Sequence, residues 1–201
     1  IASRGVLIQS ADSINVFFSS FQNFTHDVSQ ILPESSLGNS YRVDSYQGLP
    51  NFNNLHKSEL LVVATQDGTQ VQITPSVNTL SGNTAGVPFL VNLNAGQSYQ
   101  IQAATDVLDL TGTLVEATEV SGTCRPFVVI GGSMCATVPG ACQACDAIFE
   151  QLVPITAWGT RYYTAPILGV NTSTYRVLAH SNGTSVTING GAPILLNAGQ
   201  R

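Results

Sequence analysis

The sequence predicts an all-β protein made of two tandem, repeated β-sandwich-like units with many short antiparallel strands. Two observations carry this prediction. Short stretches such as residues 69–74 (TQVQIT) alternate apolar and polar side chains at period two, which is typical of strands with one buried face. Blocks of sequence also recur at a constant separation, which indicates that one unit is repeated. A β-propeller-like arrangement is the alternative for many short repeated strands.

The clearest repeat pairs residues 60–74 (LLVVATQDGTQVQIT) with residues 175–189 (YRVLAHSNGTSVTIN). A second shared block, NLNAGQ or LLNAGQ, follows each of them. Upstream, Pro33, Gly38 and Tyr41 recur at constant spacing as Pro154, Gly159 and Tyr162, and residues 5–8 and 14–17 loosely resemble 112–115 and 126–129. We therefore expect a first unit over residues 1–110 and a second over 111–201, truncated at its C-terminal end.

The elements follow in order from these patterns. Asp67-Gly68 and Asn182-Gly183 lie between apolar stretches and favour tight hairpin turns, because both residue types tolerate positive φ. Asn94-Ala-Gly and Asn197-Ala-Gly predict a second turn in each copy. Short strands are expected at residues 6–8, 14–18, 60–64, 69–74, 99–102, 126–130, 162–164 and 184–189.

One short helix is predicted near residues 146–153, where Ile148, Leu152 and Val153 could form an apolar stripe. Pro154 would end it, because the residue before a proline disfavours the helical conformation. Asp146 would then stabilise the first turn through the helix dipole. Its spacing from Glu150 also allows a carboxylate pair for acid–base chemistry, but the helix-dipole role of Asp146 with a solvated Glu150 is the favoured explanation.

The four cysteines, Cys124, Cys135, Cys142 and Cys145, lie close together in the second unit. Their even number and the single lysine, Lys57, favour two disulfides in a secreted protein, with three possible connectivities. A structural zinc site is the competing interpretation, because Cys142 and Cys145 have the spacing of a ligand pair. The other two cysteines form no second pair of this kind.

Composition excludes several classes of function. Charged residues make up 9% of the chain and the net charge is −5, so no basic surface for nucleic acid is expected. No apolar stretch is long enough to span a membrane. HExxH, GxSxG and phosphate-binding glycine motifs are absent, so we predict no enzyme and no cofactor. Asp106 and Asp109 could bind a structural calcium ion, although they lack the spacing of a known calcium loop.

The polar, uncharged composition instead suits contact with an extracellular protein or glycan. Trp158, Tyr162 and Tyr163 are the candidate ligand contacts, with core packing as the other role for Trp158. Self-association through an unpaired sheet edge is a further expectation, because such an edge accepts an added strand.

Five blocks carry a family resemblance: SELLVVATQDGTQVQITPS (58–76), AGVPFLVNLNAGQSYQIQ (85–102), DLTGT (109–113), RPFVVIGGSMCATVPGACQACDAIFEQLVPITAWGTRY (125–162) and YRVLAHSNGTSVTINGG (175–191). In this order they resemble the IgGFc-binding protein N-terminal domain family. Their sequences are similar to those in large secreted or surface-anchored bacterial proteins of the Bacteroidetes type.

The resemblance implies a non-enzymatic binding or adhesion module of a larger secreted or cell-surface protein. A structural stalk, spacer or fibre-forming unit is the alternative, and a polysaccharide- or peptide-active hydrolase is the least favoured. The resemblance also implies that Cys135 pairs with Cys145, which leaves Cys124 with Cys142. Family members carry Cys-Asp-His where this chain has Cys145-Asp146-Ala147, so no role of that histidine carries over.

Overall fold

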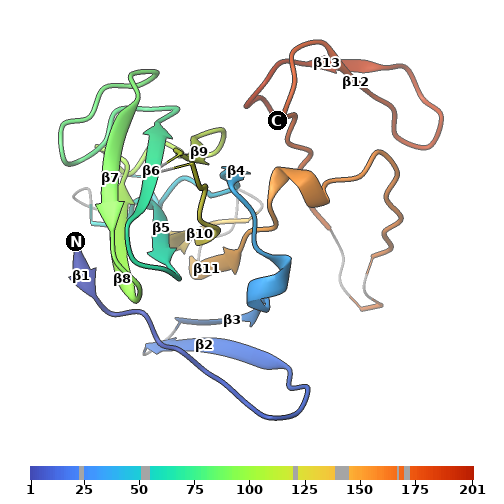
Figure 1. Cartoon of the computed structure of the whole chain (residues 1–201). Helices are drawn as coiled ribbons and strands as arrows, with labels where there is room; N and C mark the ends of the chain where they lie inside the picture. The colour runs from blue at the N-terminus through green and yellow to red at the C-terminus, as the bar shows by residue number, and fades with distance from the viewer. Residues whose placement is uncertain (23–24, 51–54, 120–121, 139–144, 167, 170–172) are drawn as a thin grey trace.

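The computed structural model describes residues 1–22, 25–50, 55–119, 122–138, 145–166, 168–169 and 173–201. Its centre is a sandwich of two antiparallel sheets (Figure 1). The five-stranded sheet has the order β1 (Ala2–Ser3), β8 (Gln97–Gln102), β5 (Ser58–Ala64), β10 (Phe127–Ala136), β11 (Asp146–Gln151). The four-stranded sheet has the order β4 (Ser40–Arg42), β9 (Leu114–Ala117), β6 (Thr69–Thr74), β7 (Phe89–Leu93). The all-β prediction is confirmed, and the described residues form no propeller.

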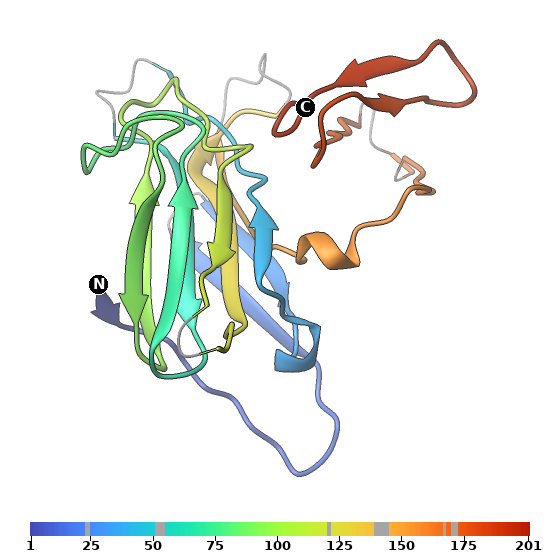
Figure 2. The same cartoon turned by 45° about the horizontal axis from the view of Figure 1, so that its top comes forward.

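The core lies between these two sheets, which Figure 2 shows as layers, one in front of the other. The strands β5 and β6 bury every second residue, as their alternating sequence requires. The side chains of Tyr41, Leu60, Val62, Ile73 and Phe127 are all buried there. Burial of each large apolar side chain contributes about 1.5–3 kcal/mol. The two sheets of the sandwich therefore share one hydrophobic core.

Two further pairs of strands lie outside the sandwich. β2 (Val16–Gln22) and β3 (Thr25–Ile31) form a hairpin that lies beside β11 (Figures 1 and 2). β12 (Thr184–Val186) pairs with β13 (Ile194–Leu196) near the C-terminus. We call residues 154–201 the C-terminal arm, and Figure 1 shows it extending to one side of the sandwich. Short 3₁₀ helices, η1 (Glu34–Ser36) and η2 (Ile155–Ala157), follow β3 and β11.

The turns of the two repeats have the same geometry. Gly68 and Gly183 have φ values of 68° and 70°, which glycine adopts without strain. Each donates its N–H to an asparagine side chain, Asn94 or Asn197, at 3.2 Å in both copies. The repeat seen in the sequence is therefore also a repeat of local structure.

The predicted helix near residues 146–153 is wrong, because Asp146–Gln151 forms β11 and pairs with β10. A short run containing Ile148 and Phe149 suits a strand as well as a helix, so periodicity alone could not separate them. The neighbouring strand decides the outcome, since it supplies partners for the backbone groups. Residues 6–8 and 162–164, also predicted as strands, form none in the structure.

The strands of the sandwich come from both sides of the expected boundary between residues 110 and 111. β9 pairs with β4 and β6, and β10 pairs with β5. The sandwich thus runs essentially from β4 to β11, with β1 added at one edge. The division of the sequence into units at 1–110 and 111–201 stays a prediction.

Candidate functional site

The aromatic residues expected to contact a ligand lie at the start of the C-terminal arm. Pro154 precedes η2 with φ −64° and ψ 154°, and the chain leaves η2 at Trp158 in an extended conformation. Trp158 is half-buried, and its Nε1 donates to the Val153 carbonyl at 3.4 Å. Its ring meets His180 edge to face, with 6.4 Å between the centroids. Trp158 therefore packs within the arm on one side and is open on the other.

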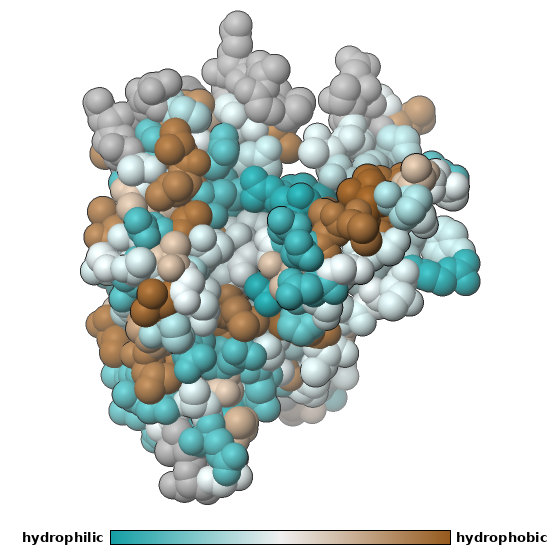
Figure 3. All heavy atoms as spheres, turned by 90° about the horizontal axis from the view of Figure 1, so that it is seen from above, coloured by the Kyte–Doolittle hydropathy of each residue, from teal (hydrophilic) through white to brown (hydrophobic). Residues whose placement is uncertain are grey.

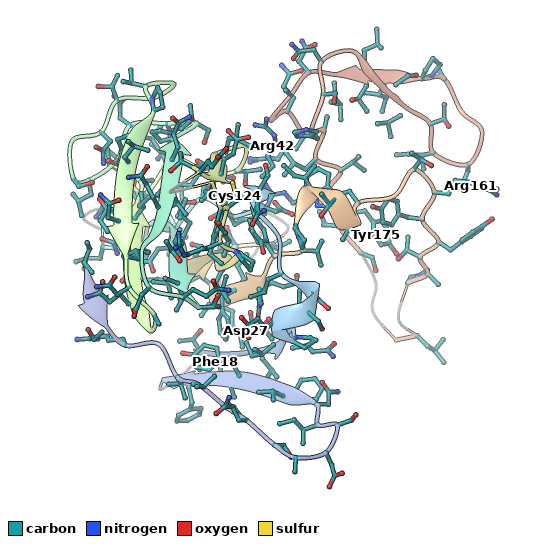
Figure 4. All side chains as sticks on the ribbon, viewed as in Figure 1. Phe18, Asp27, Arg42, Cys124, Arg161 and Tyr175 are labelled. Carbon is teal, nitrogen blue, oxygen red and sulfur yellow. A yellow bond between two sulfur atoms is a disulfide. The ribbon has the colours of Figure 1, made fainter. Side chains whose placement is uncertain are left out.

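Tyr162 and Tyr163 are the most exposed of these aromatics, at 75% and 88% of their full surface. Arg161 contacts Tyr163: its Nη2 donates to the Tyr163 hydroxyl at 2.9 Å, and its guanidinium carbon lies 6.0 Å from the Tyr163 ring centroid. Figure 4 shows Arg161 pointing outward from the arm. Sequence reasoning missed Arg161, although its place beside two tyrosines was a usable signal.

The three aromatics form two groups rather than one cluster. Trp158 contacts His180, whereas Tyr163 contacts Arg161. Tyr162 accepts a hydrogen bond from the Gly159 N–H at 2.7 Å. Its counterpart Tyr41 makes the same bond with Gly38 at 2.9 Å, but Tyr41 is fully buried. Exposure is thus a property of the arm and not of this local motif.

The hairpin carries a second exposed apolar surface, formed by Phe17, Phe21 and Val28. Pairing of β2 with β3 places Val28 opposite Ser19, diagonal to both phenylalanines on one face. The sequence pattern VFFSSF does not alternate strictly, so the sequence did not single out these residues. The three side chains have no function assigned by the sequence patterns.

The opposite face of the hairpin is tied to the edge of β11 by alternate polar side chains of β3. Thr25 accepts from the Ala147 N–H at 2.7 Å, Asp27 from Phe149 at 2.7 Å, and Ser29 from Gln151 at 3.1 Å. The Phe18 and Phe149 rings add a contact at 5.0 Å between centroids. Because these partners satisfy backbone donors, β11 is not an open strand edge.

A cavity lies between the hairpin and the outer face of the five-stranded sheet. It is lined mainly by apolar groups, including Phe18, Leu61, Ile130 and Phe149. Glu59 is its acidic residue, and both carboxylate oxygens already accept from the amides of Gln100 and Gln102. Among the described residues that line the cavity, the ionisable one is therefore already engaged by protein groups.

Ionic contacts join the C-terminal arm to the sandwich at Arg176. Its Nη1 lies 3.1 Å from Asp44, and its Nη2 lies 3.6 Å from Asp109 and 2.9 Å from the Thr111 hydroxyl. The guanidinium also covers the Tyr46 ring at 4.8 Å. Burial raises the pKa of the Asp44 carboxyl, and the charge of Arg176 opposes this rise. Arg176, Asp44 and Asp109 thus form an ionic junction between the arm and the sandwich.

Asp109, one of the two candidate calcium ligands, is occupied by protein groups. Its Oδ1 accepts from the Thr111 N–H at 2.8 Å and hydroxyl at 2.6 Å, and its Oδ2 pairs with Arg176 and Arg201. Asp106 is buried. Across the described residues, no group of three or more His, Cys, Asp or Glu side chains could hold a metal ion.

A disulfide joins Cys135, near the end of β10, to Cys145, just before β11, with 5.1 Å between their Cα atoms. This is the pair that the family resemblance implied. Cys124 is exposed, and Cys142 lies outside the described residues. The pairing of Cys124 with Cys142 stays a prediction.

Comparisons with known proteins agree with the sequence resemblance. The family model described as "IgGFc binding protein" matches residues 27–201. A human protein named "IgGFc-binding protein" is 28% identical over 194 residues, which cover 95% of this chain and 3% of the human protein. No solved structure matches this chain. Within the described residues, no helix has the length and apolar character needed to cross a membrane.

Proposed function

Because the chain belongs to the IgGFc binding protein family, we propose that it is a non-enzymatic, protein-binding module of a larger extracellular protein. The human relative is named for binding the Fc part of immunoglobulin G, and this chain spans only 3% of that protein's length. The extracellular location is supported by the Cys135–Cys145 disulfide, since such bonds persist in oxidising compartments. The similarity to bacterial surface proteins stays a prediction.

The exposed Tyr163 ring with Arg161 against it is the observation that carries this proposal. Tyrosine, tryptophan and arginine dominate the binding energy of protein interfaces, because they bury a large area and still make hydrogen bonds. Trp158 lies three residues before Arg161 and five before Tyr163, and it adds a half-buried indole on the same segment. We assign the ligand contact to these three residues and give Tyr162 a different role below.

A protein ligand suits this surface better than a glycan. The segment is exposed, and Arg161 is the charged group next to the aromatic ring. Small-molecule and sugar sites are more often concave, with several converging polar groups. The titratable groups described above already have protein partners, which supports a binding role over an enzymatic one.

Binding of the 201-residue chain to the Fc fragment of immunoglobulin G, measured by surface plasmon resonance, tests the proposal. Replacing Tyr163 or Arg161 by Ala should weaken binding at least tenfold, because hot-spot residues contribute more than about 1.4 kcal/mol. Thr160→Ala is the matched control, since Thr160 is an exposed polar residue of the same segment. It should leave the affinity unchanged.

Two other results would replace the proposal. Specific binding to a glycan array, lost in Tyr163→Ala, would make the ligand a carbohydrate. Failure to bind Fc, other extracellular proteins or glycans would favour a structural spacer, a role that tandem repeats also serve.

A further inference from the structure

We propose that the hairpin of one molecule pairs with the C-terminal arm of a second copy of this chain and completes a second sandwich there. Strand β2 would add to residues 174–179 of the other molecule as β10 adds to β5 within the sandwich. The partner is thus another copy, recognised through backbone pairing and complementary apolar side chains. This association is independent of the Fc-binding proposal.

The arm carries positions equivalent to core residues that the described part of the chain leaves exposed. The repeat aligns Val177 with Val62, and Ile188 with Ile73. In the sandwich Val62 and Ile73 are fully buried, whereas Val177 is 42% exposed and Ile188 is 62% exposed. Tyr162, the equivalent of the buried Tyr41, is exposed in the same way. Figure 3 shows apolar surface on the side of the arm as well as on the sandwich.

The arm nevertheless has the local geometry of the first copy. Asn197 accepts from Gly183, and Asn182 accepts from Ala198 at 3.0 Å, matching Asp67 with Ala95 at 3.0 Å. Residues 173–179, equivalent to the central strand β5, form no strand. The arm therefore keeps the turn of the first copy, whereas its segment equivalent to β5 is paired with the described residues only at Ala179, which bonds to residues 199 and 200.

The hairpin has the features of the missing half. η1 follows β3 as η2 follows β11, and the prolines before them, Pro33 and Pro154, have φ values of −66° and −64°. The two hairpins also share their register: Gln30 pairs with Phe17, and Gln151 pairs with Ile130. β2 and β3 are thus the structural counterparts of β10 and β11.

This equivalence fixes the register of the proposed contact. Within the sandwich, Val129 lies opposite Val62, and Gly131 lies opposite Leu60. Val16 and Phe18 occupy the corresponding positions of β2, and Val177 and Tyr175 those of the arm. We therefore expect Val16 opposite Val177 and Phe18 opposite Tyr175 across the interface. An apolar residue then meets an apolar or aromatic residue at each inward position.

The hairpin and the arm of one molecule lie apart, so the proposed contact has to form between two molecules. Figure 4 shows Phe18 on the hairpin and Tyr175 on the arm, on different sides of the molecule. Each copy offers one hairpin and one arm, so the contact is head-to-tail and can continue from molecule to molecule. Because Phe18 lies on the hairpin face that contacts β11, the hairpin has to leave β11 to make the new contact. Phe18 then exchanges Phe149 for the new neighbour, and the three side-chain bonds from β3 to β11 break.

Cross-linking between two variants tests the register. One protein carries Val16→Cys and the other Val177→Cys, both on a background in which Cys124 and Cys142 are replaced by Ser. Mild oxidation of the mixture should join the two proteins at least tenfold faster than a mixture of Val16→Cys with Val87→Cys. Val87 is the matched control because it is exposed and lies in a loop of the sandwich.

Sedimentation of the unmodified 201-residue chain gives the second measurement. The average mass should rise with protein concentration, and Val177→Asp should abolish the rise while Val87→Asp leaves it intact. Because Val177 is partly exposed, circular dichroism should show that the variant keeps the sandwich.

Three results would overturn the proposal. The chain could remain monomeric at every concentration, or the cross-link could form at the same rate with the control. A double variant carrying both cysteines could also cross-link only within one molecule, which would mean that the hairpin folds back on its own arm.

Discussion

Tyr41 and Tyr162 make the same hydrogen bond with a glycine three residues earlier, yet one is buried and the other exposed. The difference comes from residues far away in the sequence. The Tyr41 hydroxyl also donates to the Phe127 carbonyl at 2.8 Å, and the two rings lie 5.1 Å apart. The motif sets the side chain's direction, and β10 supplies its surroundings.

Replacing Tyr41 by Phe should therefore destabilise the sandwich by about 1–3 kcal/mol, since two buried backbone groups lose their partner. Tyr162→Phe is the matched control and should change stability by less than about 0.5 kcal/mol. Urea unfolding of the two variants measures both values. Equal effects would mean that Tyr162 is also buried in solution.

The fold class followed from residues whose role is local. Gly68 and Gly183 predicted turns because their positive φ is a property of the residue itself. The contact of Arg176 with Asp44 could not be predicted, because the two lie far apart in the sequence and meet only when the arm docks. Trp158 and Tyr163 were predicted as candidate ligand contacts, but their partners His180 and Arg161 depend on the chain path after η2.

At the scale of elements, the edge of β11 shows why the helix prediction failed. The segment from Asp146 to Gln151 receives backbone partners from β10 on one side and side chains of β3 on the other. Neither neighbour is visible in the local sequence. Gly132 allows the close approach of these strands, since a Cβ there would lie 2.2 Å from the Ile148 carbonyl oxygen.

Ser29→Ala tests the side-chain ladder between β3 and β11. Ser29 is buried, and its loss leaves the Gln151 N–H without that acceptor. The free energy of unfolding should fall by about 1–3 kcal/mol. Ser19→Ala, on the exposed face of the same hairpin, should have no measurable effect. Equal effects of the two substitutions would contradict this ladder.

The contact between β3 and β11 at Thr25 and Asp146 should respond to acid. The hydrogen bond from Thr25 holds the pKa of Asp146 below its ordinary value of about 3.9. A carboxyl whose pKa is lowered by folding stabilises the fold above its unfolded pKa, and this contribution is lost as pH falls through the folded value. The protection factor of the Ala147 amide, which compares its exchange with that of an unstructured peptide at the same pH, should fall in that acidic range in the wild type. Asp146→Asn should remove this pH dependence, and a persistent dependence would point to another group.

The Cys135–Cys145 disulfide links β10 covalently to the start of β11. Replacing both Cys135 and Cys145 by Ser should lower the free energy of unfolding by about 2–4 kcal/mol, mainly by enlarging the unfolded ensemble. Adding a reductant to this variant tests the other pair: a further loss of stability is expected if Cys124 and Cys142 are joined. An unchanged stability, together with thiol labelling of Cys124, would refute that second bond.

At the scale of the whole molecule, the sandwich and the arm are joined by polar contacts. Arg176 contacts Asp44, Asp109 and Thr111. The backbones also approach closely at Gly112, where a Cβ would lie 2.6 Å from the Gly199 carbonyl oxygen. Ionic contacts of this kind weaken with salt when they are partly exposed. The position of the arm is therefore less firmly held than the sandwich core.

Arg176→Met should release the arm while leaving the sandwich folded. We expect faster tryptic cleavage at Arg161 and a larger radius of gyration in solution scattering, with an unchanged unfolding midpoint of the core. Arg125→Met is the control, because Arg125 hydrogen-bonds to Gly68 within the sandwich at 3.2 Å. Cleavage at the same rate in wild type and Arg176→Met would show that the junction does not hold the arm.

The matching turns have a consequence for how the chain folds. The bonds of Thr184 to Ser181 and of Gly183 to Asn197 close short loops, whose entropic cost is small. We expect each copy to carry its own early nucleus at this turn, so that both β-hairpins form before any strand from a distant part of the chain arrives. During synthesis, the hairpin of each copy would thus form as soon as it leaves the ribosome. Pairing of that hairpin with strands from distant parts of the chain would be the slow step.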